Sequence, residues 1–236
     1  MSTQVAELGT ILSVWAHPDD ETYLSGGIMA LARRNGQRVV CVSATAGELG
    51  TPDPDVWPPD RLGRLRRWEA AAAMAVLGVA EHRFLGYPDG GLAALDPSEP
   101  IGKLRALLED VRPDTVLTFG PDGMTYHPDH QTVSKWVTEA VHTYRPTARL
   151  LHCVGTSEHY AVWQQRYEEW GVFMTDERPI GVPEAEVDLC VKLSGEVLDQ
   201  KIAALASMYS QVSPAIALMG MDDYQRSNAI EAYVRA

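Results

Sequence analysis

The stretch TILSVWAHPDDE, residues 10–21, decides the fold. Its first seven residues are apolar or small, and a cluster of polar residues follows them at once. A short apolar run that ends in turn-forming residues is typical of a strand buried on both faces. Residues 10–16 are therefore predicted to form a strand inside a sheet, with His17, Asp19 and Asp20 just beyond its carboxyl end.

Further apolar segments alternate with helical patterns along the first 143 residues. Strands are predicted at 38–45, 82–85 and 114–119, and helices at 26–35, 60–77, 101–111 and 130–143. Near-continuous apolar strands separated by helices favour a parallel sheet that helices cover on both faces. The predicted fold class is therefore α/β, a Rossmann-like three-layer fold with a mainly parallel central sheet.

The pattern weakens after residue 143. Strands are predicted at 150–154, 186–189 and 232–235, and a helix at 193–209. No repeat or linker divides the chain, and 236 residues suit one large domain. We expect a single domain, residues 1–236, with a core at 1–143 and a less regular part at 144–236 that completes the substrate cleft.

The composition excludes several classes of protein. Hydrophobic residues make up 45% and charged residues 22% of the chain, which argues against disorder and coiled coil. The net charge of −12 predicts no general attraction to nucleic acid or anionic lipid. Apolar runs too short for a membrane span, an N-terminus without a signal pattern and three widely spaced cysteines predict a cytoplasmic protein.

Histidine and aspartate gather at two predicted strand ends. They are His17, Asp19 and Asp20 after the first strand, and His127, Asp129 and His130 after the fourth. In open parallel sheets, ligands bind beyond the carboxyl ends of the strands. Imidazole and carboxylate ligands suit Zn²⁺, and three of them leave one position for water. Either segment alone fits a capped helix start, but the two together predict a catalytic metal site.

Four motifs follow one another in the chain: AHPDDE at 16–21, TAGELGT at 45–51, an Arg-x-x-Glu helix that leads to Leu-Gly-Val, and FGPDG with HPDH between 119 and 130. In this order they resemble the PIG-L/LmbE family of zinc-dependent N-acetylglucosaminyl de-N-acetylases. The resemblance covers roughly residues 10–143, and elements at 201–205 and 210–211 echo the family more weakly. It implies metal-dependent hydrolysis of an N-acetyl or other N-acyl group on an amino sugar or its conjugate.

The resemblance divides the roles among the six motif residues. The implied metal ligands are His17, Asp20 and His130, with Zn²⁺ expected and Fe²⁺ or another divalent metal as the alternative. The implied catalytic residues are Asp19, His127 and Asp129. Asp19 would be the general base for water, His127 would stabilise the oxyanion and protonate the amine, and Asp129 would orient His127.

Arg66 matches a family arginine that contacts the substrate, and Asp89 and Glu48 are candidates to bind sugar hydroxyls. A surface ion pair or a turn position is the alternative for all three. The chain departs from the family at Met208, where members often carry His, and at Thr125, where some carry Tyr. These departures leave the implied ligands intact but bear on substrate contacts. The sequence therefore predicts a small-molecule amino-sugar substrate without selecting one, and a homo-oligomer is compatible with the family.

Other functions stay open as alternatives. His17, Asp19 and His130 also fit the two-His-one-carboxylate pattern of non-haem iron enzymes, although that chemistry usually sits in β-sandwiches. A catalytically inactive sugar-binding relative would keep the fold, but it would be expected to have lost a ligand, the base or the acid. A nucleotide-binding module is disfavoured because no G-x-G-x-x-G follows the first strand.

Residues 51–60, TPDPDVWPPD, are too rich in proline for a helix or a central strand. They are predicted to be either a lid over the site or a stiff connector, in which Trp57 either stacks on a sugar or packs on the protein. Several histidine and aromatic residues lie outside the motifs and are predicted to be structural: His82, His142, His152, His159, Tyr160, Trp163, Tyr167 and Trp170.

Overall fold

The computed structural model describes residues 3–236 and contains one seven-stranded sheet, in the order β3-β2-β1-β4-β5-β7-β6. The strands are β1 (Ile11–Trp15), β2 (Val39–Ser43), β3 (Glu81–Phe84), β4 (Thr115–Phe119), β5 (Arg149–Val154), β6 (Leu189–Lys192) and β7 (Ile230–Arg235). The strands β1 to β5 pair in parallel, whereas β7 runs antiparallel to both β5 and β6. The predicted α/β class with a mainly parallel sheet is confirmed.

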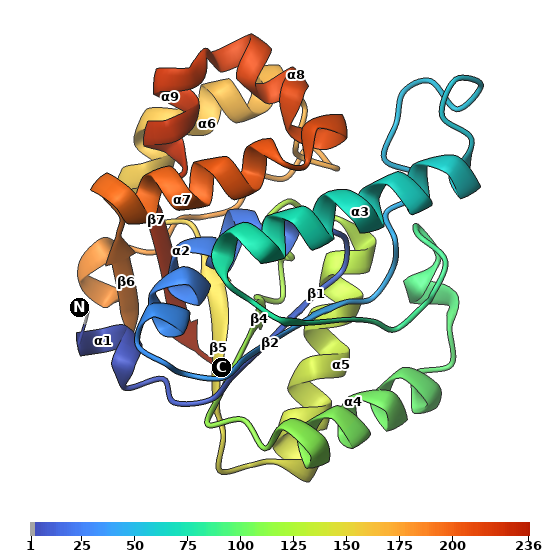
Figure 1. Ribbon diagram of the computed structural model, residues 1–236, viewed down its shortest axis with the longest axis vertical. Coiled ribbons are helices and arrows are strands. Elements are labelled where there is room, and N and C mark those ends of the chain that lie inside the picture. The colour runs from blue at the N-terminus through green and yellow to red at the C-terminus, as the bar shows by residue number, and fades with distance from the viewer. Residues whose placement is uncertain (1–2) are drawn as a thin grey trace.

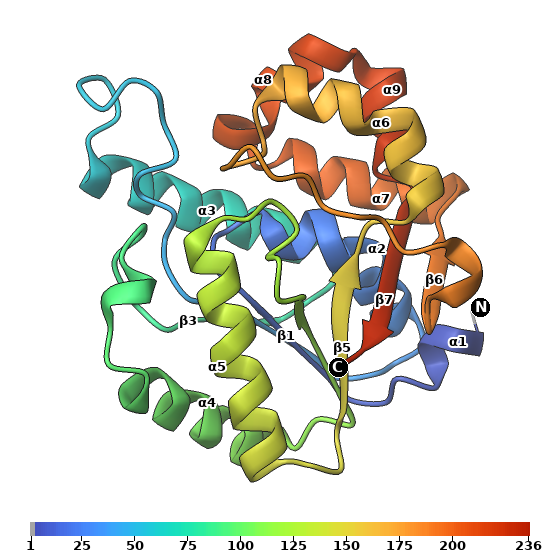
Figure 2. The same cartoon turned by 180° about the vertical axis from the view of Figure 1, so that it is seen from behind.

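Helices cover both faces of the sheet. They are α1 (Thr3–Ala6), α2 (Asp20–Arg34), α3 (Pro59–Leu77), α4 (Ser98–Val111), α5 (Pro128–Tyr144), α6 (Ser157–Trp170), α7 (Gly195–Ala206), α8 (Tyr209–Met219) and α9 (Met221–Ser227). Figures 1 and 2 show α2, α3 and α7 on one face and α4 and α5 on the other. Because both faces are covered, β1, β2 and β4 are buried at every position, which explains their unbroken apolar sequences.

Helix α2 begins at Asp20, six residues before the predicted start at Gly26. A carboxylate from the far end of the chain bonds to the middle turn of this helix. The Glu231 oxygens accept hydrogen bonds from the backbone N–H groups of Gly27, at 2.7 Å, and Ile28, at 2.8 Å. The sequence pattern therefore predicted α2 only from Gly26 onward and missed its first six residues.

The carbonyl groups of the same helical turn are also bonded by side chains from the C-terminal part. Lys201 donates to the Tyr23 carbonyl at 2.7 Å, and the Tyr233 hydroxyl donates to the Leu24 carbonyl at 2.8 Å. In a regular helix these carbonyls would accept the N–H groups four residues later. Lys201 Nζ also lies 2.8 Å from Glu231 Oε1, and both side chains are fully buried. The C-terminal part thus bonds directly to the backbone of the first motif's helix.

The C-terminal part is more regular than predicted. Helices α6, α8 and α9 were not expected, the strand predicted at 186–189 begins only at Leu189, and the helix predicted at 193–209 ends at Ala206. The residues of α6 give a weak helical pattern because none of them is fully buried. Strands β6 and β7 belong to the same sheet as β1 to β5. The predicted single domain, residues 1–236, stays a prediction.

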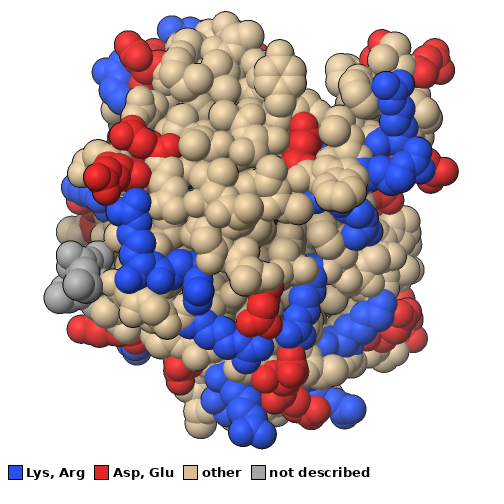
Figure 3. Space-filling view, in the orientation of Figure 1, with Lys and Arg blue, Asp and Glu red and all other residues tan. Residues whose placement is uncertain are grey.

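Within residues 3–236, no single helix is long and apolar enough to span a membrane. Only α7 and α8 taken together, across a bend of 117°, reach that length and apolar composition. On the face drawn in Figure 3, acidic and basic side chains alternate along the lower edge, and the centre is largely uncharged.

The proline-rich stretch is a mostly exposed loop that projects from the body of the molecule ahead of α3 (cyan in Figures 1 and 2). Trp57 packs against the Arg61 guanidinium, whose carbon lies 4.5 Å from the ring centroid. Among the described residues that line the cavity reported below, none comes from 51–60. The loop therefore lies outside the described lining of the cavity, and Trp57 packs on the protein.

Candidate active site

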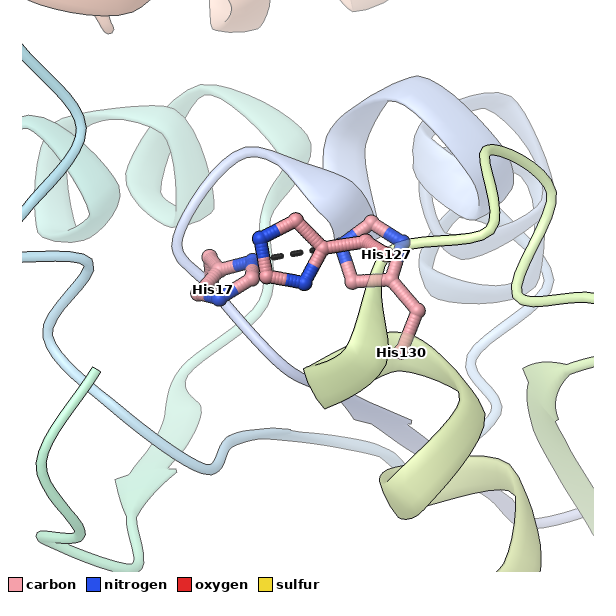
Figure 4. Close-up of side chains that lie close together, drawn as sticks. All are labelled: His17, His127 and His130. Carbon is pink, nitrogen blue, oxygen red and sulfur yellow. Dashed lines mark hydrogen bonds between the residues drawn. The ribbon is translucent and has the colours of Figure 1, made fainter. Parts of the chain in front are cut away.

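The ends of two adjacent strands bring the six motif residues together. Strands β1 and β4 pair in parallel, so the loop after β1 and the loop that enters α5 lie at the same edge of the sheet. The loop after β1 carries His17 and Asp19 and leads into α2 at Asp20, while His127, Asp129 and His130 lie at the start of α5. Figure 4 shows the three imidazoles of this group close together.

Three of these side chains have the spacing of ligands around one metal ion. His17 Nδ1 lies 3.2 Å from His130 Nε2 and 3.5 Å from Asp20 Oδ2, and His130 Nε2 lies 3.4 Å from Asp20 Oδ1. Tetrahedral zinc with ligands at about 2.0–2.2 Å holds them about 3.3–3.6 Å apart. His17, Asp20 and His130 therefore fit the ligand set that the sequence predicts.

The contacts of His130 keep its ring neutral and leave Nε2 free to bind a metal ion. Its Nδ1 lies 2.9 Å from the carbonyl oxygen of Gly123, so Nδ1–H donates there and Nε2 is left free of a proton. Burial lowers the pKa of His130 to about 4, which keeps the ring neutral. Gly123 has φ +65°, and a Cβ there would lie 2.7 Å from the His130 Cβ. A glycine is needed to bring this carbonyl so close to the ring.

Asp129 lies elsewhere than its predicted role requires. Its carboxylate accepts the N–H groups of Gly90 and Leu92, at 2.8 and 3.1 Å, and lies 3.5 Å from His17 Nε2. It is the Asp129 backbone N–H that donates to His127 Nδ1, at 3.1 Å. Because Nδ1 accepts this bond, the neutral His127 ring carries its proton on Nε2. The orientation of His127 thus comes from the Asp129 main chain at the start of α5, and not from the carboxylate.

Asp19 is held in a strained backbone conformation, with φ +117° and ψ −37°. Its backbone N–H donates to Glu21 Oε2 at 3.1 Å. Although Asp19 stands at the N-terminus of α2, its side chain makes no capping hydrogen bond and lines the cavity. Burial raises the pKa of Asp19 to about 7, and the nearby Arg66 opposes the rise. A carboxyl group with a pKa near neutrality suits a general base at neutral pH.

Arg66 was predicted to contact the substrate, but its guanidinium already bonds to the protein. Its Nη1 donates to the Gly47 carbonyl at 2.6 Å, and its Nη2 donates to the Pro18 carbonyl at 2.5 Å and to Asp19 Oδ2 at 3.2 Å. Only 3% of the residue is exposed. Arg66 therefore fixes the Asp19 loop from behind rather than reaching toward a ligand.

Glu48 and Asp89, the other two predicted substrate contacts, bond to each other's loops. Glu48 Oε1 accepts the Asp89 N–H at 2.9 Å, and Glu48 is not among the described residues that line the cavity. Asp89 lines the cavity, accepts the Leu49 N–H at 2.9 Å and lies 3.0 Å from His17 Nε2. Asp89 is thus placed to orient His17, and Glu48 supports Asp89 from outside the cavity.

Residues 12–141 match the model of the PIG-L family, described as GlcNAc-PI de-N-acetylase. The chain belongs to this family. It is also 32% identical to the 1D-myo-inositol 2-acetamido-2-deoxy-alpha-D-glucopyranoside deacetylase of Saccharomonospora viridis, over 93% of this chain and 90% of that relative. The predicted family is confirmed, and the relative's name is that of an enzyme that cleaves a carbon–nitrogen bond.

Solved structures with the PIG-L family fold carry different activities. The N,N'-diacetylchitobiose deacetylase of Pyrococcus horikoshii has a TM-score of 0.67 at 20% identity, over 100% of this chain and 86% of that one. The 4-carboxy-2-hydroxymuconate hydratase GalB of Pseudomonas putida has a TM-score of 0.65 at 19% identity, over 96% and 95%. These likenesses show the shared fold, and the reaction has to be argued from the site.

In this PIG-L family member, a cavity of about 680 Å³ opens beside the motif residues. The C-terminal part supplies much of its wall, including four residues that were predicted to be structural: His159, Tyr160, Tyr167 and Trp170. The three aromatic residues share one side of α6 because they are spaced by seven and three positions. That spacing was visible in the sequence, but nothing in the sequence says that this side faces a cavity.

The two departures from the family pattern lie in different surroundings. Thr125 lines the cavity, whereas Met208 is buried in the hydrophobic core. Of the two, only Thr125 is therefore placed to change a contact with the substrate.

Proposed function

We propose that this chain hydrolyses the N-acetyl group of an amino sugar or an amino-sugar conjugate, with a divalent metal, Zn²⁺ first, held by His17, Asp20 and His130. The observation that carries the proposal is the convergence of His17 Nδ1, His130 Nε2 and the two carboxylate oxygens of Asp20, at separations of 3.2, 3.4 and 3.5 Å, beside the partly buried Asp19 carboxyl. Membership of the PIG-L family and a relative named as a deacetylase support the same reaction.

Asp19 and His127, which lie beside the three proposed metal ligands, have different roles in the reaction. A zinc ion bound there would polarise the amide carbonyl and lower the pKa of a water molecule to about 7. Asp19 takes a proton from the attacking water. His127 lies 4.8 Å from the His17 ring and 4.7 Å from the His130 ring, between centroids, and burial lowers its pKa. The neutral ring donates a hydrogen bond through Nε2–H to the developing oxyanion. As the carbon–nitrogen bond breaks, the leaving amine takes the proton that Asp19 removed from water, and not a proton of the neutral His127 ring, so a free amine and a carboxylate are formed.

Removing the metal should abolish the activity. We expect chelator-treated protein to release primary amine from N-acetylglucosamine conjugates at least about 10²–10³-fold more slowly, because a metal supplies several kcal/mol of stabilisation in such reactions. Added Zn²⁺ should restore the rate. The measurement is amine release beside the metal content of the same sample.

Two variants on histidines provide the control for that experiment. His130→Ala should lose both metal and activity, whereas His142→Ala, at an exposed position of the same helix, should keep both. Full activity in metal-free protein would refute the proposal. Oxygen consumption without amine release would instead support the non-haem iron alternative.

Arg66→Lys should lower kcat more than it raises KM. An ammonium group cannot reproduce the bonds from two guanidinium nitrogens to Gly47, Pro18 and Asp19, so the base would shift from its position. A misplacement of about 1 Å can cost about 10²-fold in rate. Steady-state kinetics decide the matter, with Arg67→Lys as the neighbouring control. A large rise in KM at unchanged kcat would return Arg66 to its predicted role as a substrate contact.

The proposal also retains the expectations of a small amino-sugar conjugate as substrate and of a cytoplasmic location. All three cysteines are free thiols, with Cys41 and Cys153 buried and Cys190 partly buried. Free thiols fit a reducing compartment. A homo-oligomer stays a prediction from the family resemblance.

A further inference from the structure

Aromatic side chains gather on the side of the cavity that the C-terminal part builds. We call the following residues the aromatic subsite: Tyr23, Tyr160, Tyr167, Trp170 and Phe173. The Tyr23 ring lies 6.0 Å from Trp170, between centroids, so these two rings adjoin, and the buried Tyr224 packs against Tyr23 at 6.3 Å. Figure 2 shows β5 pointing toward the group of α6, α8 and α9 that carries most of this surface.

The polar atoms of the aromatic subsite are largely used within the protein. The hydroxyl oxygens of Tyr23 and Tyr224 lie 2.7 Å apart, and the Tyr167 hydroxyl lies 2.7 Å from His159 Nε2. Because these groups already bond to one another, the subsite offers ring faces more than free hydrogen-bond donors. Ring faces favour flat apolar groups, which stack on them or meet them edge-on.

Apart from the proposed metal site, the described lining of the cavity offers no Lys or Arg side chain that is free to bind an anionic ligand. Arg66 is the only Lys or Arg among the described residues that line it, and both of its terminal nitrogens bond to the protein. Burial lowers the pKa of His159 to about 4, so this imidazole is neutral near pH 7. The carboxylates of Asp19 and Asp89 line the same cavity and repel anions. An anionic group on the substrate would therefore lose its hydration without gaining a partner.

The size of the cavity indicates a substrate larger than one sugar ring. Cavities of about 300–1,000 Å³ hold drug-sized ligands, and this one measures about 680 Å³. We propose that the aromatic subsite binds an uncharged apolar group, aryl in particular, that the N-acylated amino sugar carries. This inference rests on the proposed function and names its substrate class. The chain thereby selects against conjugates with phosphate or carboxylate at that position.

Matched substrates test the proposal and show where the apolar group is attached. They are N-acetylglucosamine, its phenyl glycoside, its 4-carboxyphenyl glycoside, and N-phenylacetylglucosamine. We expect kcat/KM for one of the two uncharged aryl compounds to exceed that for N-acetylglucosamine by about tenfold or more, as the burial of an aromatic group allows. The phenyl glycoside would place the aryl group on the glycosidic side, and the phenylacetyl compound would place it on the acyl side.

The 4-carboxyphenyl glycoside tests the charge argument. Equal or faster hydrolysis of this compound relative to the phenyl glycoside would overturn the proposed selection against anions. Equal kcat/KM for N-acetylglucosamine and both uncharged aryl compounds would overturn the subsite itself.

Two cavity variants and one surface control test whether the preference for the aryl compound comes from the aromatic subsite. Trp170→Ala should lower the ratio of kcat/KM for the preferred aryl compound over N-acetylglucosamine toward one. Trp68→Ala, at a position on α3 that is 77% exposed and does not line the cavity, should leave the ratio unchanged. Met174→Lys, at a cavity position that is 53% exposed and therefore tolerates a charge, should shift the preference toward the 4-carboxyphenyl glycoside. Unchanged ratios in both cavity variants would overturn the assignment.

A binding measurement separates this inference from the proposed reaction. Phenyl glucoside has no N-acyl group, so calorimetry can compare it with methyl glucoside in the absence of turnover. Tighter binding of phenyl glucoside that Trp170→Ala removes would support the subsite even if no compound released amine, an outcome in which the proposed deacetylation alone would fail. Equal binding of both glucosides, together with equal binding of phenylacetamide and acetamide, would overturn the subsite even if deacetylation occurred.

Discussion

Replacing Asp19 by Asn should lower kcat/KM for amide hydrolysis by about 10²–10⁴-fold, the range that a positioned general base contributes. The substitution removes the carboxylate that takes a proton from water but keeps the size of the side chain. Asparagine also tolerates a positive φ better than most residues, so the backbone at φ +117° should be retained. Amine release under saturating Zn²⁺ provides the measurement.

The control for Asp19→Asn is Asp55→Asn, at an exposed position in the proline-rich loop. Both variants should bind metal and unfold at the temperature of the unchanged protein. If Asp19→Asn kept its metal and its fold but lost less than tenfold in kcat/KM, Asp19 would not be the base. Asp89 would then be the candidate base, because its carboxylate lies 3.0 Å from His17 Nε2 and also lines the cavity.

Replacing Lys201 by Met should lower the free energy of unfolding by about 3–5 kcal/mol, the usual cost of removing one partner from a buried ion pair. Glu231 would remain fully buried with its charge uncompensated, and the Tyr23 carbonyl would lose its donor. Urea denaturation, with the slope checked against the unchanged protein, measures the loss.

Two further variants show whether that loss comes from the buried charge. Lys201→Met combined with Glu231→Gln should recover part of the stability, because it removes the uncompensated carboxylate. Lys192→Met, which breaks the more exposed pair with Glu184, should cost less than about 1 kcal/mol. A loss below about 1 kcal/mol for Lys201→Met would mean that the pair does not stabilise the fold.

The central sheet and the convergence of the motifs could be predicted because both follow from local patterns. The strands β1, β2 and β4 are short apolar runs, and a parallel sheet aligns their carboxyl ends whatever the details of the loops. The structure accordingly brings His17, Asp20 and His130 within 3.5 Å of one another. Their role as ligands stays a prediction for the metal experiment.

The contacts that differ from prediction depend on residues far apart in the chain. Arg66 bonds to carbonyls contributed by two other loops, and the Asp129 carboxylate is held by the amides of Gly90 and Leu92. The middle turn of α2 is bonded by Lys201, Glu231 and Tyr233, which lie 178 to 209 positions away. Sequence spacing cannot report such partners, since each one is chosen by the packing of the whole fold.

The side chains that bond to the middle turn of α2 limit how this enzyme could be redesigned by exchanging segments. Grafting residues 144–236 from a relative would be the direct way to replace most of the aromatic subsite by that of the relative. The graft would also replace the carboxylate and the ammonium group that bond to the α2 backbone at Tyr23, Gly27 and Ile28. A functional chimera therefore needs a donor segment with Lys and Glu at the positions of Lys201 and Glu231.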